Sequence, residues 1–149
     1  MSGDVNVRRA KKLLTTPRFT YAGCVASLCN SVITEASQQP DFDEKPGYIY
    51  FITASNGRDR LTKIGLSNNP QGRVLGIRTH FPPFYDVEIE LSASFVIYGK
   101  KRVRFAERCM HEAFREYHVD GEWFRLPDSG YSQLATLSRQ LPPPRKRRS

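Results

Sequence analysis

Residues 47–67 read GYIYFITASNGRDRLTKIGLS, and the local pattern of this stretch decides the fold. Its first part, GYIYFIT, is rich in β-branched and aromatic residues and lies between Pro46 and the turn-forming Ser55-Asn56-Gly57. That composition and those boundaries predict a β-strand. RLTKIGLS follows the turn as a second candidate strand, so the two segments predict an antiparallel hairpin.

The residues after the hairpin predict a helix, a third strand and a longer helix. Asn69 and Pro70 have the types preferred at an N-cap and at the first helical position, and this helix must end before Pro82. Residues 87–97, VEIELSASFVI, alternate between apolar and polar, which predicts a strand with one buried face. Residues 100–117 place apolar side chains three or four apart, as on one face of a helix: Val103, Ala106, Met110, Phe114 and Tyr117.

Composition divides the chain of 149 residues into three parts around one expected core. Residues 1–45 contain a basic segment, a stretch of small residues and a polar, acidic run, so we expect an N-terminal irregular extension and linker. Residues 46–127 hold nearly all of the aromatic and periodic signal and form the expected domain. Residues 128–149 predict a short C-terminal helix followed by a basic tail, because prolines interrupt the chain before RKRRS.

The charge balance favours a polyanionic partner. The formal net charge is +8 and the isoelectric point is about 9.7, and each Lys or Arg that meets a phosphate releases a condensed counterion. The basic cluster of the tail is expected to raise nucleic-acid affinity without specifying sequence, or to act as a nuclear import signal in a eukaryotic source. Its members are Arg145, Lys146, Arg147 and Arg148.

The cysteines and the hydropathy of the chain indicate in which cellular compartment the protein is expected. The three cysteines are odd in number and lack metal-ligand spacing, so they are expected to be reduced thiols of an intracellular protein. That protein would be cytoplasmic, or nuclear if the source is a eukaryote or a virus of eukaryotes. No apolar stretch approaches the roughly 18–20 residues that span a bilayer, so no membrane partner is expected.

Glu107 is the most informative residue of the predicted helix over 100–117. It falls inside the apolar stripe, where a carboxylate is costly unless it is paired or binds a cation. Two interpretations stay open: an ion pair with an Arg at the edge of the stripe, or a metal ligand. His111 lies one turn beyond Glu107 and could act as a base, as an acid for the leaving group, or as a packed histidine.

The order of these elements and three short motifs resemble the GIY-YIG nuclease superfamily. The closer likeness is to its branch found in bacteriophages and fungi. The motifs are KIGLSNNPQGR at 63–73, FAERCMHEAF at 105–114 and GEWF at 121–124. The resemblance implies an α+β fold in which a small three-stranded antiparallel sheet is flanked by helices. It also implies hydrolysis of phosphodiester bonds with Mg²⁺ or Mn²⁺, with DNA favoured over RNA.

Four residues match functional positions of that family or replace them. Tyr50 matches the tyrosine of the first motif, Arg73 the family arginine and Glu107 the family glutamate. Lys63 stands where the family has the tyrosine of its second motif, so the chain departs from the pattern there.

The chemistry makes those residue types sensible. Glu107 would hold the metal ion through oxygen, as hard cations prefer, and Arg73 would bind the scissile phosphate with its fork of donors. Tyr50 would position or deprotonate the attacking water, although a phenol with a pKa near 10 needs a cation to serve as a base. Lys63 could supply that cation, act as the base if burial disfavours its charged form, or be a surface lysine of the hairpin.

Further residues have weaker expected roles. Tyr48 would form a wall of the site, and Arg78 and His80 would contact the nucleic-acid backbone or lie on a solvated face. Glu122 and Trp123 are expected to belong to the fold, with Trp123 as a core anchor and Glu122 as an ion-pair or capping partner.

Three functions compete at this point. The leading hypothesis is a metal-dependent endonuclease that acts on DNA. A non-catalytic nucleic-acid-binding module on the same fold is the main rival, because Lys63 replaces a family tyrosine. A metal-ready Glu107 argues against that rival, since a pure binder needs no such group. The third hypothesis is a protein-interaction factor with basic tails, and a protein partner could also deliver the nuclease to its target.

Overall fold

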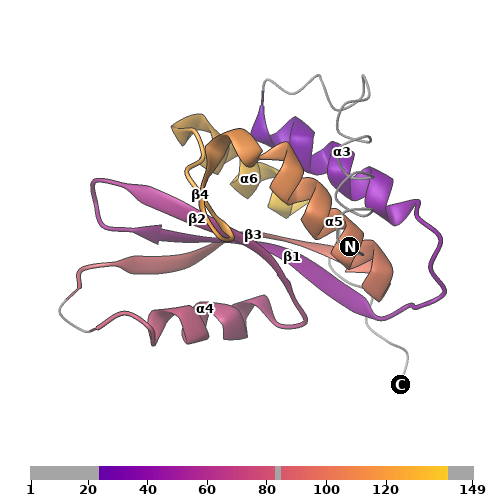
Figure 1. The fold of residues 1–149 in the computed structure, drawn as a ribbon, viewed down its shortest axis with the longest axis horizontal. Coiled ribbons are helices and arrows are strands. Elements are labelled where there is room, and N and C mark those ends of the chain that lie inside the picture. Colours follow the sequence, from indigo (N-terminus) through magenta and orange to yellow (C-terminus); the bar gives the residue numbers. More distant parts are fainter. Residues whose placement is uncertain (1–23, 83–84, 141–149) are drawn as a thin grey trace.

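The computed structural model describes residues 24–82 and 85–140. They form an α+β domain built on one five-stranded antiparallel sheet, with the strand order β3-β1-β2-β5-β4. Helices cover both faces of the sheet: α4 lies on one face, and α3, α5 and α6 lie on the other (Figure 1). The strands are β1 (Pro46–Ser55), β2 (Arg60–Ser67), β3 (Glu88–Tyr98), β4 (His118–Asp120) and β5 (Trp123–Phe124).

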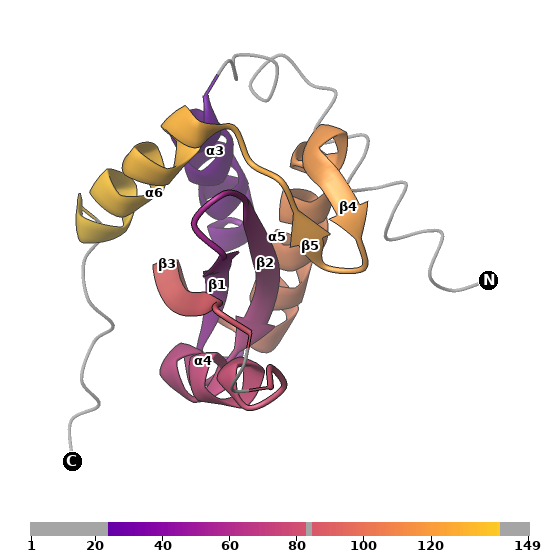
Figure 2. The ribbon, with the colours of Figure 1, turned by 90° about the vertical axis from the view of Figure 1, so that its left-hand side faces the viewer.

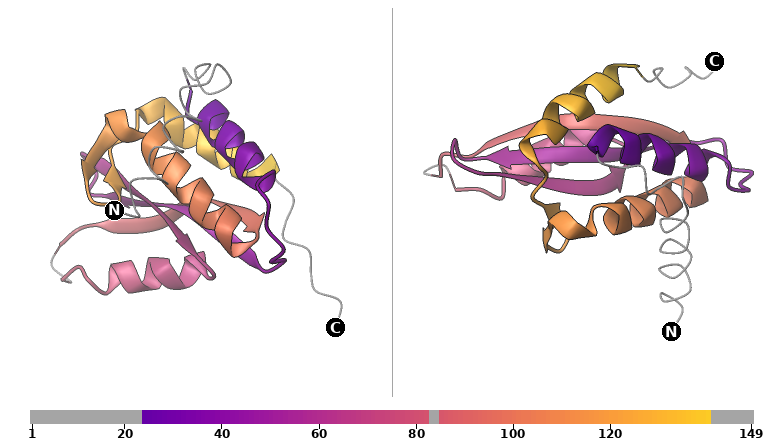
Figure 3. Two further views of the ribbon diagram at one scale, coloured as in Figure 1. Left: turned by 45° about the vertical axis from the view of Figure 1, so that its right-hand side comes forward. Right: turned by 90° about the horizontal axis from the view of Figure 1, so that it is seen from above.

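The helices follow in chain order. They are α3 (Val25–Ser37), α4 (Pro70–Arg78), α5 (Lys100–Ala113) and α6 (Asp128–Gln140), with a short 3₁₀ turn, η1 (Arg115–Tyr117), after α5. On the three-helix face, α3 lies between α5 and α6 (Figures 2 and 3). No helix in the described part of the chain is long and apolar enough to cross a bilayer.

The predicted hairpin is confirmed. β1 and β2 pair in antiparallel register from Tyr48–Ser67 to Ser55–Arg60. The Asn56 side chain closes the turn by accepting hydrogen bonds from the backbone N–H groups of Arg58 and Asp59, at 3.0 and 2.8 Å.

Alternation along β1 divides the buried side chains between two cores. Ile49 and Phe51 point to the three-helix face, where the Phe51 ring packs edge-to-face on Phe95 at 5.9 Å between centroids. Tyr50 and Ile52 point to the α4 face. Because β1 is covered on both sides, its sequence is a nearly continuous apolar run.

The expected count of three strands is too low, because β4 and β5 extend the sheet beyond β2. These strands have three and two residues, too few for a pattern of period two to appear in the sequence. Gly121 joins them with a φ of +56°, in the left-handed region that favours glycine. β5 pairs with β2 only at Thr62 and Lys63, so the edge of β2 from Ile64 onward has no strand beside it.

Within the expected N-terminal extension and linker, residues 25–37 form a regular helix, α3, which the sequence did not predict. Its Val25, Cys29, Val32 and Ala36 are buried in the core at helical spacing. Their small side chains and the polar residues between them gave a weak apolar signal, yet they suit close packing against α5 and α6.

The C-terminal helix is confirmed as α6, and its Leu134 is fully buried. The basic cluster at 145–148 lies outside the described residues. All three cysteines are free of disulfides, as expected.

The segment before β1, although far from α5 in the sequence, caps the N-terminus of that helix. Gly99 stands at the N-cap of α5 without a capping side chain, and its φ is +110°. Asp41 accepts hydrogen bonds from the backbone N–H groups of Lys101 and Arg102, at 3.0 and 3.4 Å, and Asp43 accepts one from Lys100 at 3.2 Å. Carboxylates are favourable at a helix N-terminus, so this loop fixes where α5 begins.

We predict that Asp41→Ala lowers the Tm by about 2–4 °C at pH 7, because α5 loses its capping carboxylate. Hydrogen bonds from the N–H groups of Asp43, Lys101 and Arg102 hold the pKa of Asp41 below its usual value. The stabilisation is therefore fully present above about pH 4 and is lost as the pH falls further. Thermal unfolding measured by circular dichroism across this range checks the prediction.

Glu44→Ala is the matched control, because Glu44 is an exposed carboxylate of the same segment. Equal Tm values for the two variants would contradict the capping role of Asp41.

Candidate active site at the open edge of β2

The open edge of β2 is contacted by residues of two other segments, helix α5 and the turn before β5. The N–H of Ile64 donates to the carbonyl of Glu122 at 3.0 Å, and the carbonyl of Ile64 accepts from Nε2 of His111 at 2.7 Å. The N–H of Leu66 donates to the carboxylate of Glu107. Backbone groups at a strand edge need partners, and here the partners include a histidine and a glutamate, residue types that can bind metal ions.

These contacts bring Glu107, His111 and Glu122 into one half-buried cluster, in which their potential ligand atoms lie within 4.8 Å of one another. Glu107 and His111 are four residues apart on α5 and therefore share one face of that helix. Glu122 is the residue immediately before β5.

The cluster suits a divalent cation. Burial raises the pKa of Glu107, and nearby Glu122 raises it further, while His111 lowers it. Two half-buried carboxylates so close together are costly without a compensating cation. Because Nε2 of His111 donates to the Ile64 carbonyl, Nδ1 is the ring nitrogen that remains for a metal ion, an arrangement common for metal-binding histidines. Two carboxylates and one imidazole fit Mg²⁺ or Mn²⁺ by donor type.

A tyrosine–arginine pair lies beside this cluster, on the α4 face of the sheet. Tyr50 is 1% exposed, and Arg73 on α4 hydrogen-bonds its hydroxyl. Burial raises the pKa of Tyr50, the bond from Arg73 opposes that rise, and the carboxylates of Glu122 and Glu107 add to it. The hydroxyl is therefore neutral at neutral pH.

Gly65 makes room for the Tyr50 ring. The two residues face each other across β1 and β2. A Cβ atom at position 65 would lie 2.6 Å from Cζ of Tyr50, closer than non-bonded carbon atoms approach. Steric room for the Tyr50 phenol, which lies directly over the Cα atom of Gly65, therefore explains why the KIG motif has a glycine at this position.

The start of α4 places Arg73. Asn69 caps the helix by accepting from the N–H of Gly72 at 3.1 Å, and Pro70 occupies the first turn, as the sequence predicts. Arg73 is exposed to solvent close to the helix N-terminus, a position that favours anions.

Lys63 joins the two parts of the site. Its side chain shares the α4 face with Tyr50, two strand positions from Gly65, and its Nζ lies 3.6 Å from Oε2 of Glu122. Both side chains are partly exposed, at 21% and 41%, so the pair adds little to stability. The pair matters for the site rather than for stability, since it places the Lys63 ammonium group beside the cluster of potential metal ligands.

The other sequence-predicted residues lie outside this cluster or at its margin. Tyr48 is half-buried on β1, two residues before Tyr50 and on the same face. Arg78 donates to the carbonyl of Ile89 at 2.8 Å, and a ring nitrogen of His80 lies 2.7 Å from the carbonyl of Gly76. Arg78 and His80 therefore have backbone partners at the far end of α4 and do not join the cluster.

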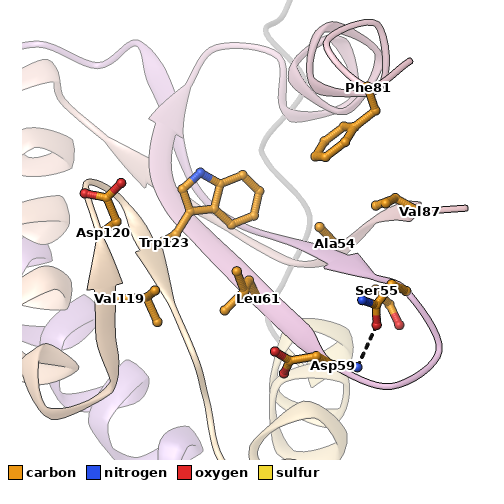
Figure 4. Close-up of a pocket in the computed structure, with 10 residues that line it drawn as sticks. Ala54, Ser55, Asp59, Leu61, Phe81, Val87, Val119, Asp120 and Trp123 are labelled. Carbon is orange, nitrogen blue, oxygen red and sulfur yellow. Dashed lines mark hydrogen bonds between the residues drawn. The ribbon is translucent and has the colours of Figure 1, made fainter. Parts of the chain in front are cut away.

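Sequence reasoning misplaced Trp123 and gave Glu122 only part of its surroundings. The expected ion pair of Glu122 is present, with Lys63 at 3.6 Å, and its carboxylate also lies in the cluster of potential metal ligands. Trp123 is not the core anchor: Phe124 is buried in the core, and Trp123 lines a pocket on the α4 face (Figure 4). The GEWF motif could have pointed to these residues, but a strand of two residues does not reveal which side chain points inward.

The fold and the site together place the chain in the class of nuclease-related α+β domains. A family model, the T5orf172 domain, matches residues 47–140, well over half of the chain. The chain belongs to this phage-associated domain family. The match includes the whole candidate site and leaves α3 outside. Comparisons with curated proteins and with solved structures found no match.

We predict that Gly65→Ala destabilises the protein by about 1–3 kcal/mol, because the added methyl group displaces the Tyr50 ring. Urea unfolding measures the change. Gly76→Ala is the matched control: it lies inside α4 with open space around it, so alanine should be neutral or stabilise by about 0.4–1 kcal/mol. A Gly65→Ala variant as stable as the Gly76→Ala variant would contradict the proposed fit.

Proposed function

We propose that this chain is a divalent-metal-dependent endonuclease that hydrolyses phosphodiester bonds in DNA. The observation that carries the proposal is the gathering of Glu107, His111 and Glu122 within 4.8 Å, beside the Tyr50–Arg73 pair. The nuclease-related fold of the family supports it, and so does the resemblance to GIY-YIG nucleases.

Glu107, Glu122 and Nδ1 of His111 would hold Mg²⁺ or Mn²⁺. The bound cation would offset the two carboxylates and supply positive charge where negative charge develops on the phosphate. The contacts of His111 and Glu107 with the edge of β2 hold their side chains in place before any metal arrives.

Arg73 would bind the phosphate. Its guanidinium is exposed and hydrogen-bonds a neutral phenol rather than a carboxylate, so it retains charge and donors for an incoming anion. Its place near the N-terminus of α4 adds the favourable end of the helix dipole. Hydrogen bonds aimed at the phosphate oxygens stabilise charge that grows in the transition state.

Tyr50 would orient the attacking water. Its hydroxyl oxygen accepts from Arg73, which leaves its own proton free to be donated. A raised pKa disfavours the phenolate, so Tyr50 serves better as a hydrogen-bonding guide than as the base. Lys63 contributes a positive charge near Glu122 and stands where the resembled family has a second tyrosine.

We predict that the purified protein nicks supercoiled plasmid DNA with Mg²⁺ or Mn²⁺ and that EDTA stops the reaction. Glu107→Ala and Arg73→Ala should each lower the nicking rate by about 100-fold or more, because each removes charge stabilisation at the reacting phosphate. Glu112→Gln is the control, since Glu112 is on the same helix but pairs with Arg115. Wild-type nicking by the Glu107→Ala variant would exclude this site as the catalytic centre.

One observation favours a non-catalytic nucleic-acid-binding module as the second candidate. The ammonium of Lys63 already lies 3.6 Å from Glu122 and could compensate its charge without a metal ion. Binding of a metal ion by the isolated protein separates the two functions, because a pure binding module has no need of it.

We predict that Mn²⁺ binds the protein at one site when no DNA is present, as isothermal titration calorimetry can measure. Glu122→Gln should weaken this binding at least about tenfold, because one of the two carboxylate ligands becomes a neutral amide. The Glu112→Gln variant should bind Mn²⁺ as the wild type does. Equal affinities in wild type and Glu122→Gln would remove Glu122 from the ligand set.

A further inference from the structure

A second feature of the α4 face is a pocket of about 470 Å³ near the β1–β2 hairpin. The sheet contributes Leu61 and Trp123, and the connection between α4 and β3 contributes Phe81 and Val87 (Figure 4). Its volume falls in the range of small-molecule sites, roughly 300–1,000 Å³.

We propose that this pocket binds an unpaired nucleobase of the DNA strand that is cut. The proposal rests on the proposed function and specifies its substrate: single-stranded DNA, or duplex DNA with an unpaired base near the scissile phosphate.

The walls of the pocket suit a flat aromatic ring. The Trp123 indole and the Phe81 ring both extend into the space between β5 and the end of α4 (Figure 4). Val119, a further lining residue, is 46% exposed, so apolar surface is open to solvent there. Bases stack on aromatic side chains whatever their identity, because every base has a π face.

The charges of the lining favour a base over a phosphate. Asp59 and Asp120 are among the ten lining residues, and these include neither lysine nor arginine. Carboxylates repel phosphate, but they accept hydrogen bonds from the N–H groups on base edges. Of these two carboxylates, Asp59 is already paired with Arg125 at 2.7 Å, which leaves Asp120 as the acceptor for a base edge.

The pocket lies on the same face of the sheet as Tyr50 and Lys63, and it neighbours the candidate active site in the chain and across the strands. Trp123 follows Glu122 in the chain and lies directly opposite Lys63 across β2 and β5. On β1, Ala54 in the pocket lies four residues from Tyr50 on the same face, roughly 13 Å along the strand. A strand whose phosphate meets Arg73 would therefore bring a neighbouring base to Trp123. Inside a duplex that base is stacked and paired, so it must be unpaired or flipped out.

The test uses Trp123 as its own reporter, because it is the single tryptophan of the chain. The full chain is titrated in EDTA with a short fluorescein-labelled single-stranded DNA. A second DNA of equal length, with abasic sites and the same phosphates, is titrated in parallel. Intact DNA should quench the Trp123 emission and bind about 5- to 100-fold more tightly by anisotropy. The abasic DNA should leave the emission unchanged.

Two variants sharpen the comparison. Phe81→Ala keeps the reporter and should weaken binding of the intact DNA about fivefold or more, with no change for the abasic DNA. Leu75→Ala is the control, since Leu75 is an exposed apolar residue of α4 that does not line the pocket.

The outcomes separate this proposal from the endonuclease function. Absence of binding, equal affinity for the two DNAs, or binding without a change in Trp123 emission would overturn the base pocket. If plasmid nicking persists in that case, the endonuclease function stands alone. Quenching and base-dependent affinity without metal-dependent nicking would support the pocket and remove catalysis.

Discussion

The site depends on an edge of β2 that no strand covers. Because β5 pairs with β2 only at Thr62 and Lys63, the backbone groups of Ile64 and Leu66 need other partners. They find them in His111, in Glu107 and in the carbonyl of Glu122. The same hydrogen bonds that protect an exposed edge therefore help to place the three side chains of the candidate metal site.

Helix α5, which carries two of those candidate ligands, is capped at its start and packed along one face. Asp41 and Asp43 cap its start from the preceding loop, and α3 packs against it in the core. A half-buried carboxylate such as Glu107 needs a rigid support, because its desolvation must be offset by contacts that do not drift. The N-terminal segment thus supports the chemistry without contributing to it.

The opposite face of the sheet supplies the complementary chemistry. There the alternation of β1 and β2 brings Tyr50, Lys63 and the α4 residue Arg73 to one side. It also leads along the same face to the pocket at Trp123. In the proposed function, the carboxylates at the sheet edge would bind a metal ion, the arginine on α4 a phosphate, and the apolar pocket farther along a base.

The sequence by itself determined what depends on near neighbours. The hairpin, the Asn69 cap and the placement of Glu107 and His111 on one helical face all follow from spacings of four residues or fewer and from turn chemistry. Resemblance to a family added the expectation that Tyr50, Arg73 and Glu107 belong to one site.

Only the tertiary structure decided the rest. β4 and β5 are too short to carry a period, and α3 is recognisable only through the core that it completes. The place of Glu122 in the ligand cluster depends on which part of β2 lacks a neighbouring strand. Phe124 takes the core position that was expected for Trp123, because pairing with β2 fixes which side chain points to the core. Those contacts join residues far apart in the chain, and no local pattern encodes them.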